Sequence, residues 1–209
     1  MPAYPPDHAI TTIADLEALF APPAAPSIAK EAAYIHPHYA TLIAASPFAV
    51  LATNGPDGLD VSPRGDAPGF VVVEDDTTLL LPERRGNNRI DSLRNLVVDP
   101  RVALLFLIPG HGETLRVQGR ASIVAEPALL ERFAVNGNPP KCVLVIKVES
   151  VFFQCARSVL RSRLWDPAAA MRDTALPSPG AILAALSDNA IDGGKYDAEL
   201  PARQRTTLY

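Results

Sequence analysis

The stretch Thr114-Leu-Arg-Val-Gln-Gly-Arg-Ala-Ser-Ile-Val124 alternates apolar or small residues with polar ones along most of its length. A two-residue period is typical of a β-strand with one buried side and one solvent-facing side. At about 3.3 Å per residue such a strand would span roughly 35 Å, longer than most strands. Long strands usually bend, and Gly119 gives this one a position where a bend can form.

Strand patterns also occur on both sides of this segment. The other predicted strands cover residues 48–53, 59–62, 69–73, 78–81, 102–108 and 143–153. The turn Asn54-Gly-Pro-Asp-Gly58 separates the first two. Helices do not alternate regularly with these strands, which argues against a doubly wound parallel sheet. A mainly β chain in an antiparallel barrel, closed or partly closed, leaves few unpaired edges and fits the pattern best.

Helical patterns are short. Thr12, with Asp15 three residues later, is a candidate N-cap for the first helix. Further helices are predicted at 27–34, from there to Ala45, and at 88–98, 127–135 and 154–164. Prolines gather towards both ends of the chain, where we expect segments that wrap the core without regular structure. The predicted organisation is a helical segment 1–46 packing on the barrel, the barrel itself at 47–166, and a proline-rich extension at 167–209.

The composition is ordinary for a globular protein, with 48% hydrophobic and 20% charged residues in a chain of 209. The net charge of -4 argues against a general nucleic-acid binder, so any anion site must be a local patch. Cys142 and Cys155 are too few for a disulfide framework or a four-thiolate zinc site. Neither a signal peptide nor an apolar run of 18 residues is present, so we expect a cytoplasmic protein that does not bind membranes.

Three arginines, one glycine and two asparagines crowd the junction between the strand at 78–81 and the helix at 88–98, in Pro82-Glu-Arg-Arg-Gly-Asn-Asn-Arg89. Phosphate groups bind to charged donors and to the backbone N–H groups at a helix N-terminus. The alternative is a solvated loop whose arginines pair with Glu83, Asp91 and Asp99. Local features leave both interpretations open.

Two other segments place arginines on strands. Arg64 follows the second predicted strand, and it either has a defined direction towards a ligand or closes a charged turn with Asp66. One side of the long strand carries Arg116, Gln118 and Arg120, which would line a ligand cleft or face water.

Other chemistries lack motifs. The four histidines show no His-Glu-x-x-His spacing and neither cysteine is near one, so no metal site is predicted. The chain has no Gly-x-Ser-x-Gly nucleophile motif, no phosphate loop ending in Gly-Lys-Ser/Thr and no Gly-x-Gly-x-x-Gly. Hydrolase, NTPase and dinucleotide-binding interpretations are therefore unsupported.

Five motifs occur in a fixed order: Asp60-Val-Ser-Pro-Arg-Gly-Asp66, Arg85-Gly-Asn-Asn-Arg-Ile-Asp-Ser-Leu-Arg-Asn95, Leu105-Phe-Leu-Ile-Pro-Gly110, Thr114-Leu-Arg-Val-Gln-Gly119 and Cys155-Ala-Arg-Ser-Val-Leu-Arg-Ser-Arg-Leu-Trp165. Together they resemble the FMN-binding proteins related to pyridoxamine 5'-phosphate oxidase, particularly a bacterial subgroup of unassigned substrate. The resemblance covers about residues 30–166. It implies a six-stranded antiparallel split β-barrel with short flanking helices. It also implies a homodimer that holds FMN in two clefts between the subunits.

The resemblance also implies which residues bind the cofactor: Arg64, Leu81, Pro82, Asn87, Asn88, Arg89, Thr114, Arg116, Arg163 and Trp165. Arg64, Asn88 and Arg89 correspond to the residues that hold the phosphate. Thr114 and Trp165 correspond to positions near the flavin ring. Two positions depart from the oxidase pattern, because Pro82 replaces a polar residue and Thr114 stands where the oxidases have glutamine. The arginine and histidine arrangement that binds pyridoxine phosphate is also missing, so the vitamin substrate is not supported.

The leading hypothesis is an FMN-dependent oxidoreductase acting on a small substrate, with no catalytic acid or base assigned. One alternative is a flavin-binding or flavin-sensing module without turnover, because no obvious acid or base adjoins the expected ring position. Another keeps the barrel but binds a deazaflavin or a haem-type ligand, since related barrels use those.

Overall fold

The computed structural model describes residues 8–169 and 176–209. Within these ranges the strands are β1 (Phe48–Gly55), β2 (Gly58–Gly65), β3 (Val72–Asp75), β4 (Thr78–Pro82), β5 (Arg101–Leu107), β6 (Thr114–Val124) and β7 (Val143–Gln154). The α-helices are α1 (Ile13–Glu17), α2 (Ala25–Ala29), α3 (Pro37–Ala45), α4 (Asp91–Val98), α5 (Pro127–Glu131), α6 (Arg157–Ser162), α7 (Pro179–Leu186) and α8 (Gly193–Thr206).

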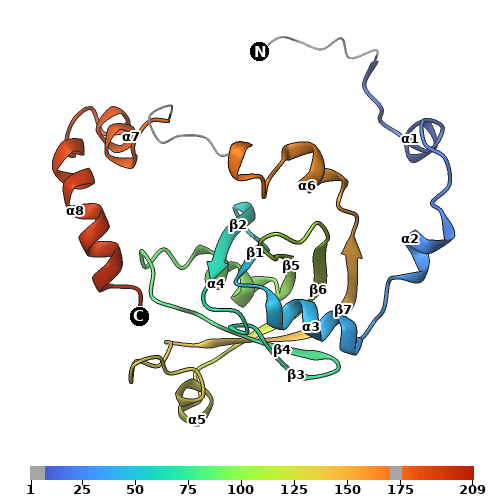
Figure 1. The fold of residues 1–209 in the computed structure, drawn as a ribbon, viewed down its shortest axis with the longest axis horizontal. Helices are drawn as coiled ribbons and strands as arrows, with labels where there is room; N and C mark the ends of the chain where they lie inside the picture. The colour runs from blue at the N-terminus through green and yellow to red at the C-terminus, as the bar shows by residue number, and fades with distance from the viewer. Residues whose placement is uncertain (1–7, 170–175) are drawn as a thin grey trace. The chain divides into compact units, whose positions relative to one another are not determined.

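The strands form one antiparallel sheet in the order β2-β1-β5-β6-β7-β4-β3, with β2 and β3 as its edges. Figure 1 shows the strands with α3 and α4 lying against them, in agreement with the contacts of α4 with β1 and of α3 with β3. The fold is a mainly β, antiparallel split barrel flanked by short helices, as predicted. The seven strands agree with the seven strand patterns in the sequence, and they are one more than the six that the family resemblance implies, with the short edge strand β3 paired to β4.

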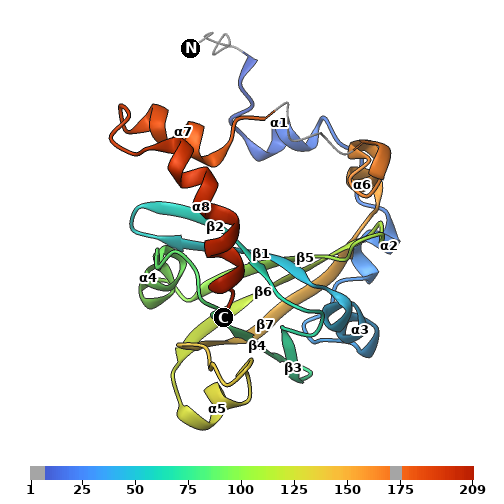
Figure 2. The same ribbon diagram turned by 60° about the vertical axis from the view of Figure 1, so that its left-hand side comes forward.

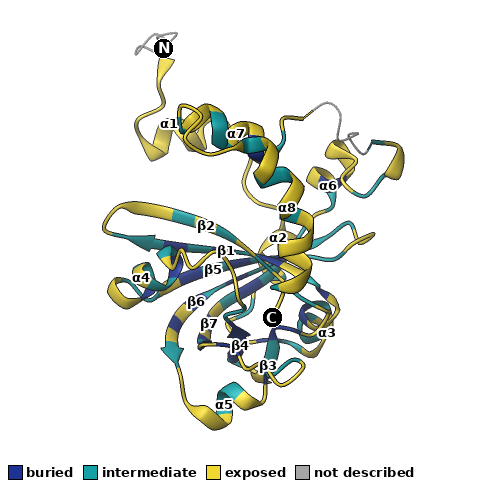
Figure 3. Cartoon of the chain, turned by 90° about the vertical axis from the view of Figure 1, so that its left-hand side faces the viewer, coloured by how far each residue is buried: buried dark blue, intermediate teal, exposed yellow. Residues whose placement is uncertain are grey.

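The core lies on one side of the sheet, here called the inner face. Leu51, Leu104, Val117 and Val151 occupy one row across β1, β5, β6 and β7, and each is at most 1% exposed. Fully burying such a side chain contributes about 1.5–3 kcal/mol. Figure 3 shows buried positions on β1 and β5, whereas the edge strand β2 is exposed or intermediate.

The bend expected at Gly119 is confirmed. The register between β6 and β7 shifts between Gln118 and Gly119, so one residue of β7 is left over at this point. A Cβ atom on Gly119 would lie 2.1 Å from the backbone oxygen of Lys147. The two strands approach this closely only because the residue has no side chain.

The helices confirm some expectations and correct others. Thr12 caps α1 by accepting the Asp15 N–H. The predicted helix at 88–98 begins later, at Asp91, because Asn88 has a positive φ of 60°. The predicted helix at 154–164 is α6 alone, which ends where Arg163 adopts the left-handed conformation at φ 53°.

The expectation of irregular structure after residue 166 is wrong. Ser178 caps α7 with Pro179 next to it, a position that tolerates proline. Asp192 caps α8, which contains Pro201. Residues 1–7 and 170–175 of the proline-rich segments lie outside the described residues.

The chain divides into two compact units, Met1–Glu31 and Ala32–Tyr209. The first contains α1 and α2, neither of which has a buried residue. The second contains the sheet, α3 to α8 and everything described below. The boundaries expected at residues 46 and 166 stay predictions.

Replacing Gly119 with alanine should lower the free energy of unfolding by about 1–3 kcal/mol, because a backbone oxygen cannot move aside without parting the strands. Urea unfolding measures the change. The matched control is Gly194→Ala, where the nearest atom to the new Cβ lies 3.6 Å away. Equal stability of the two variants would show that β6 and β7 are not in this close contact.

Candidate functional site

A cavity of about 800 Å³ opens where β2 and β4 end, a volume within the roughly 300–1,000 Å³ typical of ligand sites. Its walls come from residues 62–65, 82–90 and 138–142, with Phe70, Leu93 and Tyr209. It therefore brings together the two arginine-containing segments that the sequence separates by about twenty residues.

The lining is strongly cationic although the whole chain is acidic. It includes the basic residues Arg64, Arg84, Arg85, Arg89 and Lys141, with Glu83 as the acidic one. Clustered cations in a recess raise the local concentration of anions. The cavity is the local anion patch that the sequence predicts.

Arg64 points to the inner face, because its register partner on β1 is the buried Ala49. Its Nη2 lies 3.2 Å from Oε2 of Glu83. This contact lacks hydrogen-bond geometry: among the described residues, Arg64 Nε and Glu83 Oε2 are both buried without a hydrogen-bond partner. Burial raises the pKa of Glu83 above its ordinary value, against the opposing effect of the Arg64 charge.

Asp66 does not close a turn with Arg64. It accepts from Arg84 Nε at 2.8 Å and from the Tyr209 hydroxyl at 2.7 Å. Burial acts to raise the pKa of Asp66, but hydrogen bonds from Tyr209, the Ala67 N–H and Arg84 hold it below its ordinary value. Arg84 also donates to the Phe133 carbonyl at 2.6 Å, so its guanidinium is committed to protein partners.

The rest of the turn is more open. Asn87 accepts the Arg89 N–H at 3.0 Å, and Arg89 pairs with Asp91 at 2.9 Å although its side chain is 77% exposed. Arg85 and Lys141 show no ion pair among the described residues. The solvated-loop interpretation is thus right for Arg89 and Asp91, whereas Asp99 pairs with Arg101 and not with the turn.

The helix after the turn is fixed to the sheet by two part-buried hydrogen bonds. Asn95 Nδ2 donates to Thr53 Oγ1 at 3.2 Å, and Ser92 Oγ donates to Asp60 Oδ2 at 2.6 Å. Gly55 leaves room for Asn95, whose Oδ1 would lie 1.9 Å from a Cβ at that position. These contacts hold α4, and with it the C-terminal end of the arginine-rich turn.

The structure separates the ten predicted site residues into two sets. Arg64, Pro82, Asn87, Asn88 and Arg89 line the cavity, and Leu81 lies behind it in the core. The others, all within the described residues, are outside this lining: Thr114, Arg116, Arg163 and Trp165.

Thr114 and Arg116 project from the opposite side of the sheet, here called the outer face, because Leu115 between them is buried. The Arg116 guanidinium lies over the Phe152 ring, 5.0 Å from its centre. Trp165 donates from Nε1 to the His111 carbonyl at 2.7 Å and so ties the segment after α6 to the loop before β6. Arg163 pairs with Asp166 at 2.5 Å.

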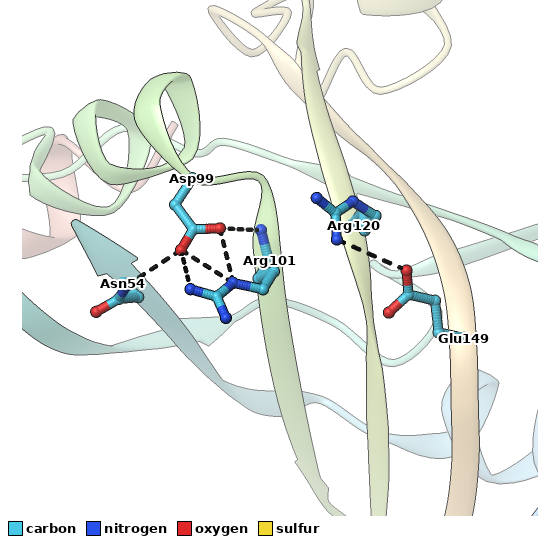
Figure 4. A network of polar contacts seen from close by, with 5 residues as sticks. All are labelled: Asn54, Asp99, Arg101, Arg120 and Glu149. Carbon is cyan, nitrogen blue, oxygen red and sulfur yellow. Dashed lines mark hydrogen bonds and ion pairs between the residues drawn. The ribbon is translucent and has the colours of Figure 1, made fainter.

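The outer face carries apolar side chains on β2 and a polar group at the start of β5. Leu59 and Val61 on β2 are exposed, with Val50 and Leu105 half-buried beside them. Figure 4 shows the polar end, where Asp99 accepts from Asn54 and Arg101 while Arg120 pairs with Glu149 at 4.0 Å. This polar group borders a second, smaller hollow of about 430 Å³.

The cavity residues that sequence reasoning did not nominate as site residues include Glu83, Lys141, Cys142 and Tyr209. Glu83 and Lys141 are charged neighbours of predicted segments, which is a weak signal. Nothing local distinguishes Cys142 or Tyr209, since only the chain's path brings them to the cavity.

In residues 8–169 and 176–209, no three His, Cys, Asp or Glu side chains are grouped so that they could hold a metal ion. Over the same residues, no helix has the length and apolar character needed to cross a membrane.

Similar solved structures include HupZ of Group A Streptococcus, at 24% identity over 58% of this chain and 94% of the other with a TM-score of 0.47. A candidate pyridoxamine 5'-phosphate oxidase of Lactobacillus delbrueckii has 22% identity over 58% and 95%, with a TM-score of 0.45. A Clostridium acetobutylicum protein related to general stress protein 26 has 16% identity over 55% and 84%, with a TM-score of 0.43.

No curated protein matches the chain. The sequence profile of the family described as pyridoxamine 5'-phosphate oxidase, however, matches residues 35–155, which is more than half of the chain and includes most of the cavity and all seven strands. The chain therefore belongs to the pyridoxamine 5'-phosphate oxidase family.

Proposed function

We propose that the protein is a flavoprotein that binds FMN in the cavity and acts as an oxidoreductase on a small substrate. The observation that carries the proposal is Arg64, a half-buried arginine in a cationic cavity, whose buried Nε has no hydrogen-bond partner among the described residues. A buried donor without an acceptor costs free energy, which a phosphate oxygen would recover. Membership of the family supports the flavin, and the volume is sufficient for one ligand of this class.

The residues fit a phosphate better than they fit a neutral ligand. Arg64, Asn88 and Arg89 would hold it, with Arg85 and Lys141 adding positive charge. A charged Glu83 would repel an anion in the cavity. Because its pKa is raised, the carboxyl is more readily protonated when an anion binds. Bound FMN would supply the hydride or electron chemistry, while the protein binds, orients and excludes water.

We further propose that the site is completed by a second copy of the chain. Arg64 points to the inner face and Arg116 to the outer face of the same sheet. Within one protomer, the two side chains therefore cannot both contact one ligand. The apolar outer face around Val61 supports packing of a second copy there. A homodimer would then bring Thr114, Arg116, Arg163 and Trp165 of one protomer to the cavity of its partner.

The visible spectrum and an FMN titration of the purified protein test the proposal. Uptake of one FMN per chain, with reduction by NADH or NADPH and reoxidation by an acceptor, supports an oxidoreductase. A bound flavin that is reduced but finds no acceptor favours the flavin-binding module. Protein that takes up no FMN excludes the flavin, and a deazaflavin or haem spectrum identifies the other ligand classes.

Replacing Arg89 with alanine should weaken FMN binding about tenfold or more, since a hydrogen bond to a charged group contributes roughly 1.5–3 kcal/mol. The side chain is exposed, so stability should not change. Arg132→Ala is the matched control, because Arg132 is also an exposed arginine in an ion pair but lies outside the cavity. Unchanged affinity in Arg89→Ala, together with lost binding in Arg64→Lys, would place the phosphate at Arg64 alone.

Replacing Val61 with aspartate should convert the dimer to a monomer and weaken FMN binding with it, because a charge would be buried in the apolar contact. Light scattering after size-exclusion chromatography measures the mass. The control is Val97→Asp, the same change at an exposed position on α4. A Val61→Asp protein that stays dimeric would show that the outer face near β2 is not the interface.

A further inference from the structure

Residues 176–209 form the helices α7 and α8 and end at Tyr209 in the wall of the cavity. Asp197 of α8 accepts from the Ser178 hydroxyl at 2.5 Å and from the Gly180 N–H at 2.7 Å. Gly180 and Gly193 are in backbone contact, because a Cβ on Gly180 would lie 2.1 Å from the Gly193 oxygen. The two helices are therefore joined as a hairpin, and Figure 2 shows α8 leading from α7 to the C-terminus.

Tyr209 is attached to the cavity by two contacts of different kinds. Its hydroxyl donates to Asp66 at 2.7 Å, and the Arg84 guanidinium lies 5.6 Å from the centre of its ring. Asp66 and Arg84 are themselves joined at 2.8 Å. One carboxylate thus links the end of β2, the arginine-rich turn and a residue 143 positions further along the chain.

Tyr209 lines the cavity of about 800 Å³, so its ring is part of the wall and leaves room for a ligand. A phenol ring beside a cationic lining offers an aromatic surface that the rest of the wall supplies only through Phe70.

From these contacts we infer that Tyr209 is a cofactor-binding residue: the α7–α8 hairpin places its ring as a wall of the FMN cavity and so slows exchange of the ligand. This inference rests on the proposed function for the identity of the ligand, but the closing of the cavity is a property of the protein alone. Within the arginine-rich turn, Arg84 therefore holds Tyr209 in place, and Arg89 is the residue that would contact the ligand.

Two cysteines allow the closure to be measured without FMN. Cys142 lines the cavity and is 6% exposed, whereas Cys155 is exposed and lies outside the lining. In a Cys155→Ser background, the rate at which a thiol reagent modifies Cys142 reports access to the cavity. Tyr209→Ala should raise this rate several-fold, and Tyr209→Phe, which keeps the ring but loses the bond to Asp66, should raise it less. Leu208→Ala, a change at the exposed neighbouring position, should leave it unaltered.

The same variants are then titrated with FMN. Tyr209→Ala should release FMN faster and bind it about tenfold more weakly, an effect equivalent to the loss of one hydrogen bond to a charged group. Thermal unfolding checks that the variant is folded, which its exposed position favours. Unchanged Cys142 modification and unchanged FMN release in Tyr209→Ala would overturn the inference while leaving the proposed function intact.

Tighter FMN binding in Tyr209→Ala would also overturn it, because the ring would then compete with the ligand. If even the unaltered protein binds no FMN, the proposed function fails. Faster modification of Cys142 in Tyr209→Ala would in that case still support the wall, and an unchanged rate would refute it.

Discussion

Side chains alternate between the two faces of one antiparallel sheet, and this alternation decides towards which face each site residue on a strand points. The row Leu51, Leu104, Val117 and Val151 fills the inner face, and a shift of one residue in any strand would expose it. Arg64 shares that face through its pairing with Ala49, so its guanidinium is directed into the protein and not into bulk water. The same alternation directs Arg116 away from the cavity.

Charge in the cavity is arranged in two tiers. In the first tier, Arg84 and Asp66 form an ion pair, and Asp66 also accepts a hydrogen bond from Tyr209. This pair has a structural role. Arg64 and Glu83 lie within ion-pair distance but leave one nitrogen and one oxygen unbonded in a buried place. Partly satisfied buried polar groups are costly in an otherwise well-packed protein. Arg85, Arg89 and Lys141 complete the cationic lining with charges that stay near water.

Much of the fold was accessible from local pattern. The strands at 102–108, 114–124 and 143–153 were recognisable from their two-residue period or apolar run. These patterns show which sides of a strand are buried, whichever elements pack against it. The bend at Gly119 and the cap at Thr12 were also predictable, since each depends on neighbours in sequence or on a missing Cβ. The α7–α8 hairpin was missed because the prolines that suggested irregular structure are tolerated at the first turn of α7 and inside α8.

By itself the sequence determined the antiparallel strands, the clustering of arginines between β4 and α4, and the family motifs that connect them, because all of these are written in short segments. Only the tertiary structure decided which charges meet. One of the two interpretations of Arg64 placed it beside Asp66, two residues away, but it faces Glu83 while Asp66 holds Arg84 and Tyr209. The reason is physical: ion pairs form between groups that the chain's path brings within a few ångströms, and the register of β2 with β1 and the return of α8 set that path, which adjacency in sequence does not encode.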